Sequence, residues 1–338
     1  MHLRRQFRLN VLELSMFIEI LILIISLAAL VYSADKFVFG AAAIARNFGI
    51  APMIIGLTIV AMGSSAPEMI VAATAALQGS SDTAIGNAIG SNITNIALVL
   101  GITALFKPLL VSSMTLKREI PILLVITLIA SYMLFDLNFT FIEGVILMVG
   151  FVAFISILLL VSLKQRKSNK IDDPMIIEAE QDIPENVKTA AAMFWLTFGI
   201  ILLPLSAHFL VDSATFIAKA FGISDLVIGL TIIAIGTSLP ELAASVMSII
   251  KKEDDLAMGN IIGSNIFNIL AVLAIPALIA PGAVDSEVAS RDAPYMIGIT
   301  FLLFLLCFSR SGQFRITRLK GAVLFIGFIA YQYLIFSQ

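Results

Sequence analysis

The sequence predicts an all-α membrane protein of ten transmembrane helices, arranged as two inverted five-helix repeats, in which helices 2 and 7 are broken at the centre. Three observations predict this fold class. Hydrophobic residues make up 59% of the 338 residues and charged residues only 13%, and the mean hydropathy is +1.03, far from the balance of a soluble domain. A 50-residue stretch occurs twice, and one polar segment divides the apolar runs into two equal groups.

The internal repeat joins residues 56–105 to residues 229–278 at an offset of 173 residues. The two copies align without a gap and are identical at 25 of 50 positions. The match extends backwards to a Ser-Ala pair in the first apolar run of each half, at Ser33 and Ser206. The N-terminal run, which imitates a signal peptide, is therefore expected to be an uncleaved first helix of the folded unit.

Ten apolar spans follow from cutting the sequence at charged, Gly, Pro and Asn positions, because about 20 helical residues cross a hydrocarbon core of about 30 Å. The spans lie near residues 14–46, 50–78, 82–106, 118–135, 139–163, 190–220, 224–250, 255–280, 293–309 and 317–336. The expected organisation is an N-terminal tail over 1–13, a first repeat over 14–163, a cytoplasmic linker over 164–187 and a second repeat over 188–338.

An odd number of spans in each half makes the second half enter the membrane from the opposite side, so an axis in the membrane plane relates the repeats. With the N-terminus outside, 15 of the 21 Lys and Arg residues fall in inner loops, as the positive-inside rule favours. The cluster of Arg4, Arg5 and Arg8 opposes this orientation. The sum over the loops predicts a multi-pass protein of the inner cell membrane with both termini outside.

Composition also limits the partners. The formal net charge is only -2, and no long basic tract is present, so nucleic acid is excluded as a partner. Cys307 is the single cysteine, which excludes an intrachain disulfide and a cysteine metal cluster. No cofactor is expected, and the partners are the lipid bilayer and small ions, with the chain working as a monomer.

Two glutamates lie in the middle of predicted spans, one in each copy of the repeat. An ionised carboxylate at that depth costs at least a few kcal/mol, so Glu68 and Glu241 are candidate functional residues. A protonated, hydrogen-bonded carboxyl is the structural alternative. Two carboxylates balance one divalent or two monovalent cations. Competition for such a shared site, combined with alternating access, would produce exchange.

Helix breaks are predicted beside both carboxylates. A proline cannot donate to the carbonyl four residues back, and the neighbouring glycines add flexibility. Backbone exposed at membrane depth is tolerated where it lines a site, and hard cations prefer oxygen ligands. The exposed backbone oxygens would include those of Ser64 and Thr237. The helix-breaking residues are Pro67 with Gly63, and Pro240 with Gly236.

The following span of each half carries polar residues at intervals of four, which place them on one helical face. Their side-chain oxygens could complete a coordination shell. The two sets are Asn87, Ser91 and Asn95 in the first half, and Asn260, Ser264 and Asn268 in the second.

Small and amide residues on the same span have structural explanations. Pairs of glycines four residues apart are typical of close helix packing: Gly86 with Gly90, and Gly259 with Gly263. For Asn92 and Asn265, hydrogen bonds to backbone near the helix breaks are favoured over direct ligation of an ion.

Other polar residues within spans are weaker candidates. The repeat does not match the types of Asp35 with Lys36, or of His208 with Asp212. A structural role is therefore favoured for His208, and a functional role stays open for His208 and, slightly more, for Asp212. Glu119 and Glu143 lie near span ends and are expected to face the membrane interface.

The motifs GSSAPE with GNAIGSNITN, and GTSLPE with GNIIGSNIFN, resemble the two alpha repeats of the sodium/calcium exchanger family, within the calcium/cation antiporter superfamily. The likeness is closest to the bacterial inner-membrane branch. It implies a ten-helix transporter with inverted repeats that exchanges external sodium for internal calcium at a central site.

The resemblance also implies roles for individual residues. Glu68 and Glu241 would be the acidic calcium ligands, helped by the backbone oxygens of Ser64 and Thr237. Asn268 resembles the potassium-independent pattern, because some relatives have Asp at this position. The remaining implied positions are Ser65, Ser91, Ser238 and Ser264 at the sodium sites, with Asn95 and Asn268 in the centre.

The expected function is therefore secondary antiport of sodium and calcium, without enzymatic activity. Three alternatives stay open from the residues alone. The same glutamates could serve proton/calcium exchange, the paired carboxylates could belong to an intramembrane protease, or the fold could have a channel-like or scaffolding role.

Overall fold

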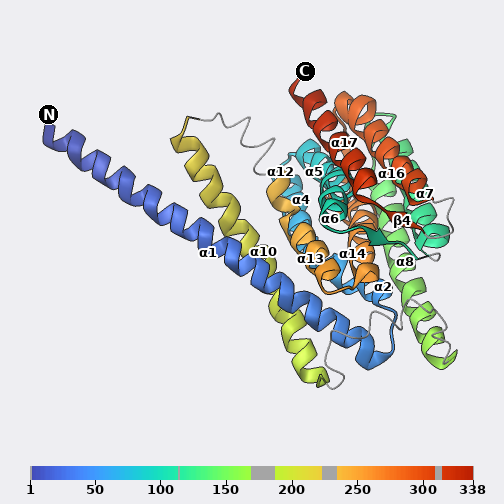
Figure 1. Cartoon of the computed structure of the whole chain (residues 1–338). Coiled ribbons are helices and arrows are strands. Elements are labelled where there is room, and N and C mark those ends of the chain that lie inside the picture. The colour runs from blue at the N-terminus through green and yellow to red at the C-terminus, as the bar shows by residue number, and fades with distance from the viewer. Residues whose placement is uncertain (1, 113–114, 169–186, 223–233, 309–313, 338) are drawn as a thin grey trace.

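The structure is a computed structural model that describes residues 2–112, 115–168, 187–222, 234–308 and 314–337 (Figure 1). Almost all of this chain is helical, and several helices contain a single wide π-helical turn, labelled η. Four two-residue strands lie in the loops.

The first half begins with the long helix α1, which then turns into a series of shorter, interrupted helices. Its elements are α1 (His2–Phe48), α2 (Pro52–Ile55), η1 (Gly56–Val60), α3 (Ala61–Ser64), α4 (Ala66–Leu77), α5 (Ser81–Thr94), η2 (Asn95–Val99), α6 (Leu100–Phe106), β1 (Leu109–Leu110), η3 (Thr115–Glu119), α7 (Ile120–Leu134), β2 (Asn138–Phe139) and α8 (Phe141–Ser168).

The second half follows the same order. Its described elements are α10 (Thr189–Ala220), α12 (Ala234–Thr237), α13 (Leu239–Ile250), α14 (Asp254–Phe267), η5 (Asn268–Val272), α15 (Ala274–Ile279), β3 (Gly282–Ala283), η6 (Val288–Asp292), α16 (Ala293–Cys307), β4 (Arg315–Ile316) and α17 (Arg318–Phe336).

The offset of 173 residues seen in the sequence is also present in the secondary structure. It relates α4 to α13, α5 to α14, η2 to η5, η3 to η6 and α7 to α16 without a shift at either end of these elements. It also relates β1 to β3. The strands pair across the halves, because β1 is antiparallel to β4 and β2 is antiparallel to β3. Each small sheet therefore joins one half to the other.

The two sheets mark opposite ends of the molecule. At the end that carries β1 and β4, Lys107 Nζ donates to the carbonyl of Ile249 at 3.1 Å. At the end that carries β2 and β3, Ser81 Oγ donates to the carbonyl of Ala280 at 2.8 Å. We call these the β1–β4 end and the β2–β3 end. The last turn of α17 and the first turns of α1 lie toward the same side of the molecule (Figure 1).

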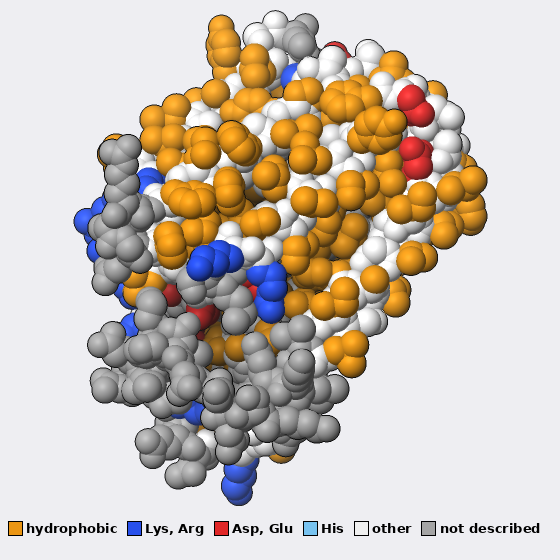
Figure 2. Space-filling model, turned by 90° about the vertical axis from the view of Figure 1, so that its right-hand side faces the viewer, with side chains coloured by type: hydrophobic (Ala, Val, Ile, Leu, Met, Phe, Trp, Pro, Cys, Tyr) orange, Lys and Arg blue, Asp and Glu red, His pale blue; other side chains and the backbone are white. Residues whose placement is uncertain are grey.

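Helices α5 and α14 form the centre of the molecule. In the apolar windows that contain them, 78% and 89% of the residues are buried, against 11% for α1 and 17% for α8. Helices α1 and α10 pack together at one side (Figure 1), where Gly40 of α1 lies against the backbone of Leu196 in α10. The outer face in Figure 2 is largely hydrophobic, with Lys and Arg toward one part of it. Such a surface is typical of a protein embedded in lipid.

Among the described residues, seven helices are long and apolar enough to cross a membrane, or eight if the bent pair Pro52–Ser64 and Ala66–Leu77 counts as one span. Two boundaries differ from the sequence expectation. The segment 1–13, expected to be a tail, is helical from His2 and continuous with α1. The predicted span 224–250 is described only from residue 234, and its first part lies outside the described residues.

Candidate functional site

Both predicted helix breaks lie next to the mid-span glutamates. Helices α3 and α4 meet at Ser65 with a bend of 46°, and Ser65 leaves helical geometry at φ -86° and ψ 9°. Ser238 has nearly the same backbone angles, φ -93° and ψ 7°, between α12 and α13. Each break puts a glutamate, Glu68 or Glu241, into the first turn of a new helix. The positive end of the helix dipole favours a carboxylate there.

The two glutamates come together from the two halves of the chain. Glu68 and Glu241 are both fully buried. Ser65 Oγ donates a hydrogen bond of 3.0 Å to Glu241 Oε1. A residue at the first break is thus bonded to the carboxylate that follows the second break.

A second link joins the first break to α14. Ser64 Oγ donates to Asn260 Oδ1 at 3.1 Å and lies 3.4 Å from Ser264 Oγ. All three side chains are at least 99% buried. Ser264 therefore lies in the same polar cluster as Ser64, while its counterpart Ser91 is also buried, at 5% exposure, on α5.

Two asparagines hold the backbone of the glutamates. Asn87 Nδ2 donates to the carbonyl of Glu68 at 3.3 Å, and Asn260 Nδ2 donates to the carbonyl of Glu241 at 3.4 Å. Asn260 Nδ2 also donates to Ser245 Oγ at 3.0 Å. The spacing of polar residues on one helical face had already marked Asn87 and Asn260 as candidates, although the roles implied by the family resemblance did not include them. In the structure their amide nitrogens hold the backbone of the glutamates.

The two central asparagines begin the π-helical turns. Asn95 is the first residue of η2 and Asn268 is the first residue of η5, and both are fully buried. The turns pack across the halves, because α4 contacts η5 and α13 contacts η2. Each glutamate-bearing helix therefore lies against the asparagine-bearing turn of the opposite half. Single π-turns inside α-helices are frequent at functional sites.

Asn92 and Asn265 hydrogen-bond backbone, as expected, but within their own helices and not at the helix breaks. Asn92 Nδ2 donates to the carbonyl of Ala88 at 2.8 Å, and Asn265 Nδ2 donates to the carbonyl of Ile261 at 2.7 Å. Both acceptors lie one turn back in the same helix.

Several buried polar atoms at the centre have no hydrogen-bond partner among the described residues. They are both carboxyl oxygens of Glu68, Oε2 of Glu241, Oγ of Ser238, the side-chain amides of Asn95 and Asn268, and the amide oxygens of Asn92 and Asn265. Most buried side-chain polar atoms are partnered, so a cluster of exceptions indicates a ligand site. Within the described ranges, no three or more His, Cys, Asp or Glu residues come together. The donor set is therefore two carboxylates with neutral oxygens, which suits hard cations.

The two flanks of this site are not equivalent. On the flank toward the β1–β4 end, Gly259 and Gly263 of α14 pack directly on the first half: a Cβ at Gly259 would lie 2.7 Å from the Met53 carbonyl oxygen. The predicted role in close packing is confirmed for these two glycines. Their counterparts Gly86 and Gly90 are half-buried, and a Cβ there would meet no described atom within 4 Å.

The same difference extends to other equivalent pairs. Asn87 and Thr237 are half-buried, whereas Asn260 and Ser64 are buried. The flank of the site toward the β2–β3 end is therefore the more exposed one.

Glycines of the helix breaks also make room for α10. A Cβ at Gly63 would lie 3.0 Å from a side-chain atom of Ile200, and a Cβ at Gly236 would overlap the side chain of Val211. Both neighbours belong to α10. The two glycines therefore leave space for a side chain of α10 and also allow the helix to bend.

Polar residues outside this cluster pair with one another. His208 Nε2 lies 3.3 Å from Asp212 Oδ2 on the exposed surface of α10. The expectation that Glu119 faces the interface is wrong. Its side chain is 3% exposed and accepts a hydrogen bond of 2.9 Å from Arg118 Nε, because an adjacent guanidinium compensates the buried carboxylate.

Comparison with known proteins agrees with this architecture. A sequence profile described as "Sodium/calcium exchanger protein" matches residues 18–160 and 191–337. The CaxA protein of Alkalimonas amylolytica is 53% identical over 323 residues, which cover 96% of this chain and all of that protein. The inner membrane protein YrbG of Escherichia coli K12 is 43% identical, covering 86% and 89% of the two chains. The sodium/calcium exchanger MaX1 of Methanosarcina acetivorans is 30% identical, covering 94% and 99%.

Solved structures show the same similarity. The sodium-calcium exchanger NCX_Mj, soaked with 10 mM Na⁺ and 10 mM Sr²⁺, superposes with a TM-score of 0.78 at 31% identity, covering 93% of this chain and 97% of that chain. The family match spans most of the chain, and its two segments coincide with the two halves described above. The chain therefore belongs to the sodium/calcium exchanger family, in its bacterial branch.

Proposed function

We propose that this chain is a secondary active antiporter that exchanges sodium for calcium by alternating access at a site in the middle of the membrane. The observation that carries the proposal is the cluster of buried, unpartnered oxygens contributed by both halves, above all the carboxyl oxygens of Glu68 and Glu241. The names of relatives such as MaX1 and NCX_Mj support sodium and calcium as the ions.

Calcium would be bound by the two carboxylates and by the backbone oxygens of Ser64 and Thr237. Two carboxylates neutralise a single divalent cation in a site that is closed to bulk water. Sodium ions, which need fewer charges each, would be shared between the same carboxylates and neutral oxygens. The proposed sodium ligands are Ser65, Ser91, Ser238 and Ser264, with Asn95 and Asn268 in the central positions.

Exchange follows from the charge of the empty site. Two ionised carboxylates in a dehydrated site cost several kcal/mol each unless a cation compensates them. The empty form should therefore resist the transition between its two open states, whereas the sodium-loaded and calcium-loaded forms should pass. The unequal flanks of the site support two alternating states, because equivalent motifs of the two halves have one buried and one partly exposed environment.

We further propose ten spans in two inverted repeats. Seven described helices, or eight with the bent pair, are long and apolar enough to cross a membrane, and the recurrence of equivalent elements at the same offset supports two related repeats. The two termini would lie outside, the linker over 164–187 would be cytoplasmic, and a single chain would suffice because both halves of the site belong to it. The activity would be transport of ions without covalent chemistry.

Proton/calcium exchange on the same scaffold is the nearest alternative, since protons could neutralise the two glutamates in place of sodium. Intramembrane proteolysis is a remote one. The many neutral oxygens around the carboxylates favour coordination of an ion over activation of a water molecule.

The test uses purified protein in liposomes that contain sodium, with calcium outside. Dilution into sodium-free buffer should drive calcium uptake in the wild type, and Glu241→Gln should reduce uptake to the level of protein-free liposomes. Glu143→Gln, outside the site at the start of α8, is the matched control and should transport normally. Calcium uptake that follows an imposed proton gradient, and does not respond to sodium, would refute sodium coupling. Peptide cleavage lost in Glu68→Gln, without ion flux in the wild type, would favour the protease.

A further inference from the structure

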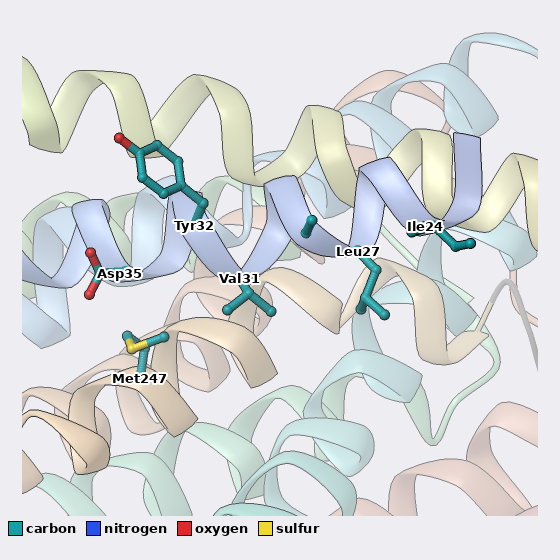
Figure 3. A pocket seen from close by; sticks show the side chains of 7 residues that line it. Ile24, Leu27, Val31, Tyr32, Asp35 and Met247 are labelled. Carbon is teal, nitrogen blue, oxygen red and sulfur yellow. The ribbon is translucent and has the colours of Figure 1, made fainter. Parts of the chain in front are cut away.

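A groove lies between α1 and α13, on the outer surface and apart from the cation site (Figure 3). Its volume is about 670 Å³. Leu27 and Val31 project from α1 toward α13, and Met247 of α13 lies at the same end of the groove as Asp35 (Figure 3). Ile24, Ala28 and Tyr32 complete the lining. The ring of Tyr32 points to the opposite side of α1 from Leu27 and Val31 (Figure 3), where it packs against Phe198 of α10. An apolar groove of this kind on a membrane helix faces lipid.

The length of the groove corresponds to one leaflet of a bilayer. From Ile24 to Asp35 the helix rises through 11 residues, or about 16 Å at 1.5 Å per residue. The hydrocarbon core of a bilayer is about 30 Å thick, so half of it is about 15 Å. A single acyl chain that extends from the headgroup region to the middle of the membrane would follow the groove from end to end.

One end of the groove carries two lysines that meet a single aspartate. Asp35 Oδ1 lies 2.7 Å from Lys251 Nζ, and Asp35 Oδ2 lies 3.1 Å from Lys36 Nζ. Two ammonium groups thus share one carboxylate, and all three side chains are between 24% and 32% exposed. A monovalent anion placed beside the lysines would neutralise the cluster.

Aromatic residues place this charged end at the boundary between hydrocarbon and water. Lys36 Nζ lies 5.4 Å from the ring centre of Tyr32 and 5.2 Å from that of Trp195, the single tryptophan of the chain. Tyr, Trp and Lys are the residues that anchor membrane proteins at the headgroup level. Lys251 follows the last turn of α13 directly, and the neighbouring Ile249 carbonyl contacts Lys107 at the β1–β4 end.

We propose that this groove is a binding site for one anionic phospholipid from the leaflet at the β1–β4 end. One acyl chain lies against Ile24, Leu27 and Val31, and the phosphate lies beside Lys36 and Lys251. Lysines at the headgroup level attract anionic lipids electrostatically. The bound lipid would bridge α1 to α13, the helix whose first turn carries Glu241.

Native mass spectrometry tests occupancy of the groove. The protein is purified in detergent and exchanged with phosphatidylglycerol. Wild type should retain one phospholipid per chain, and Ala28→Phe, which fills the groove, should retain at least tenfold less. Ala153→Phe makes the same change at an exposed position of α8 and should retain lipid as the wild type does. Equal retention in Ala28→Phe and wild type would overturn the proposal, as would retention of detergent only, or a dimer that dissociates in Ala28→Phe without any loss of lipid.

The headgroup assignment has an independent test that leaves the groove intact. Lys251→Gln leaves Asp35 with one lysine and should abolish the preference for phosphatidylglycerol over phosphatidylcholine, whereas Lys117→Gln should keep it. Quenching of Trp195 fluorescence by brominated lipids of each headgroup, present at low fraction in unbrominated lipid, measures that preference in a bilayer. No preference in the wild type, or an unchanged preference in Lys251→Gln, would refute recognition of the phosphate.

Discussion

The flank of the cation site toward the β1–β4 end is closed by the packing of α14 on η1, and this packing depends on the absence of a side chain at Gly259. A Cβ there would lie 2.7 Å from the Met53 carbonyl oxygen and 2.9 Å from the Gly56 Cα, so backbone would have to move. Overpacking of this kind costs about 1–3 kcal/mol. At 1.4 kcal/mol per tenfold change, Gly259→Ala should raise the population in which α14 has separated from η1 by roughly 5- to 150-fold. Gly86→Ala, at the equivalent position of the first half, should leave this flank closed.

A cysteine at Leu57 reports the separation. Leu57 is 2% exposed in η1, and its Cα would lie 2.7 Å from a Cβ at Gly263, so the thiol of Leu57→Cys is shielded while the flank is closed. The native Cys307 is buried and gives a low background. Alkylation by a water-soluble maleimide should accelerate by the stated factor when Gly259→Ala is added to Leu57→Cys. An unchanged rate, or equal acceleration by Gly86→Ala, would refute the assignment of the closed flank.

Two further predictions concern stability in detergent. Asn260→Ala should lower the free energy of unfolding by about 2–4 kcal/mol, because it removes hydrogen bonds to three buried groups. Asn87→Ala should lower it by about 1 kcal/mol, because only one half-buried hydrogen bond is lost. Equal shifts of the two variants in thermal unfolding would contradict this prediction. Burial raises the pKa of Glu253, in the loop between α13 and α14, to about 7, against the opposing effect of Arg46. Because the folded-state pKa is raised, the stabilising contribution is complete below about pH 4.5 and is lost as the pH rises through 7, by up to about 3 kcal/mol. Glu253→Ser, which introduces the residue found at the equivalent Ser80, should flatten the dependence of the melting temperature on pH between 5 and 8, and an unchanged dependence would exclude Glu253 as its source.

Much of the architecture could be predicted from the sequence because the two copies of the repeat are closely similar, and because the charged, Gly, Pro and Asn residues that divide it have known effects on helices. The breaks at Ser65 and Ser238 follow from prolines that cannot donate a hydrogen bond. Seven described helices, or eight with the bent pair Pro52–Ser64 and Ala66–Leu77, are long and apolar enough to cross a membrane where the sequence predicts spans. The common helical face of Asn87 and Asn260 with the predicted ligands was also evident from spacing alone.

Other features depend on tertiary contacts that local sequence does not encode. The π-turns that begin at Asn95 and Asn268 have no characteristic sequence pattern. The position of a π-turn within a helix depends on the elements that pack against it. The difference between Gly86 and Gly259 could not be predicted either. Equivalent sequences are equally compatible with the open and the closed flank, and the structure has one of the two arrangements.

The paired strands between the halves have a consequence for how the protein is made. β1 leaves the ribosome long before β4, and β2 long before β3, yet each pair is formed by partners from different halves. A newly inserted first half would therefore expose unsatisfied backbone at both ends and a bare face on α5 until the second half arrives. Folding is therefore complete only when the whole chain has been inserted. A product truncated before β4 lacks the strand that pairs with β1.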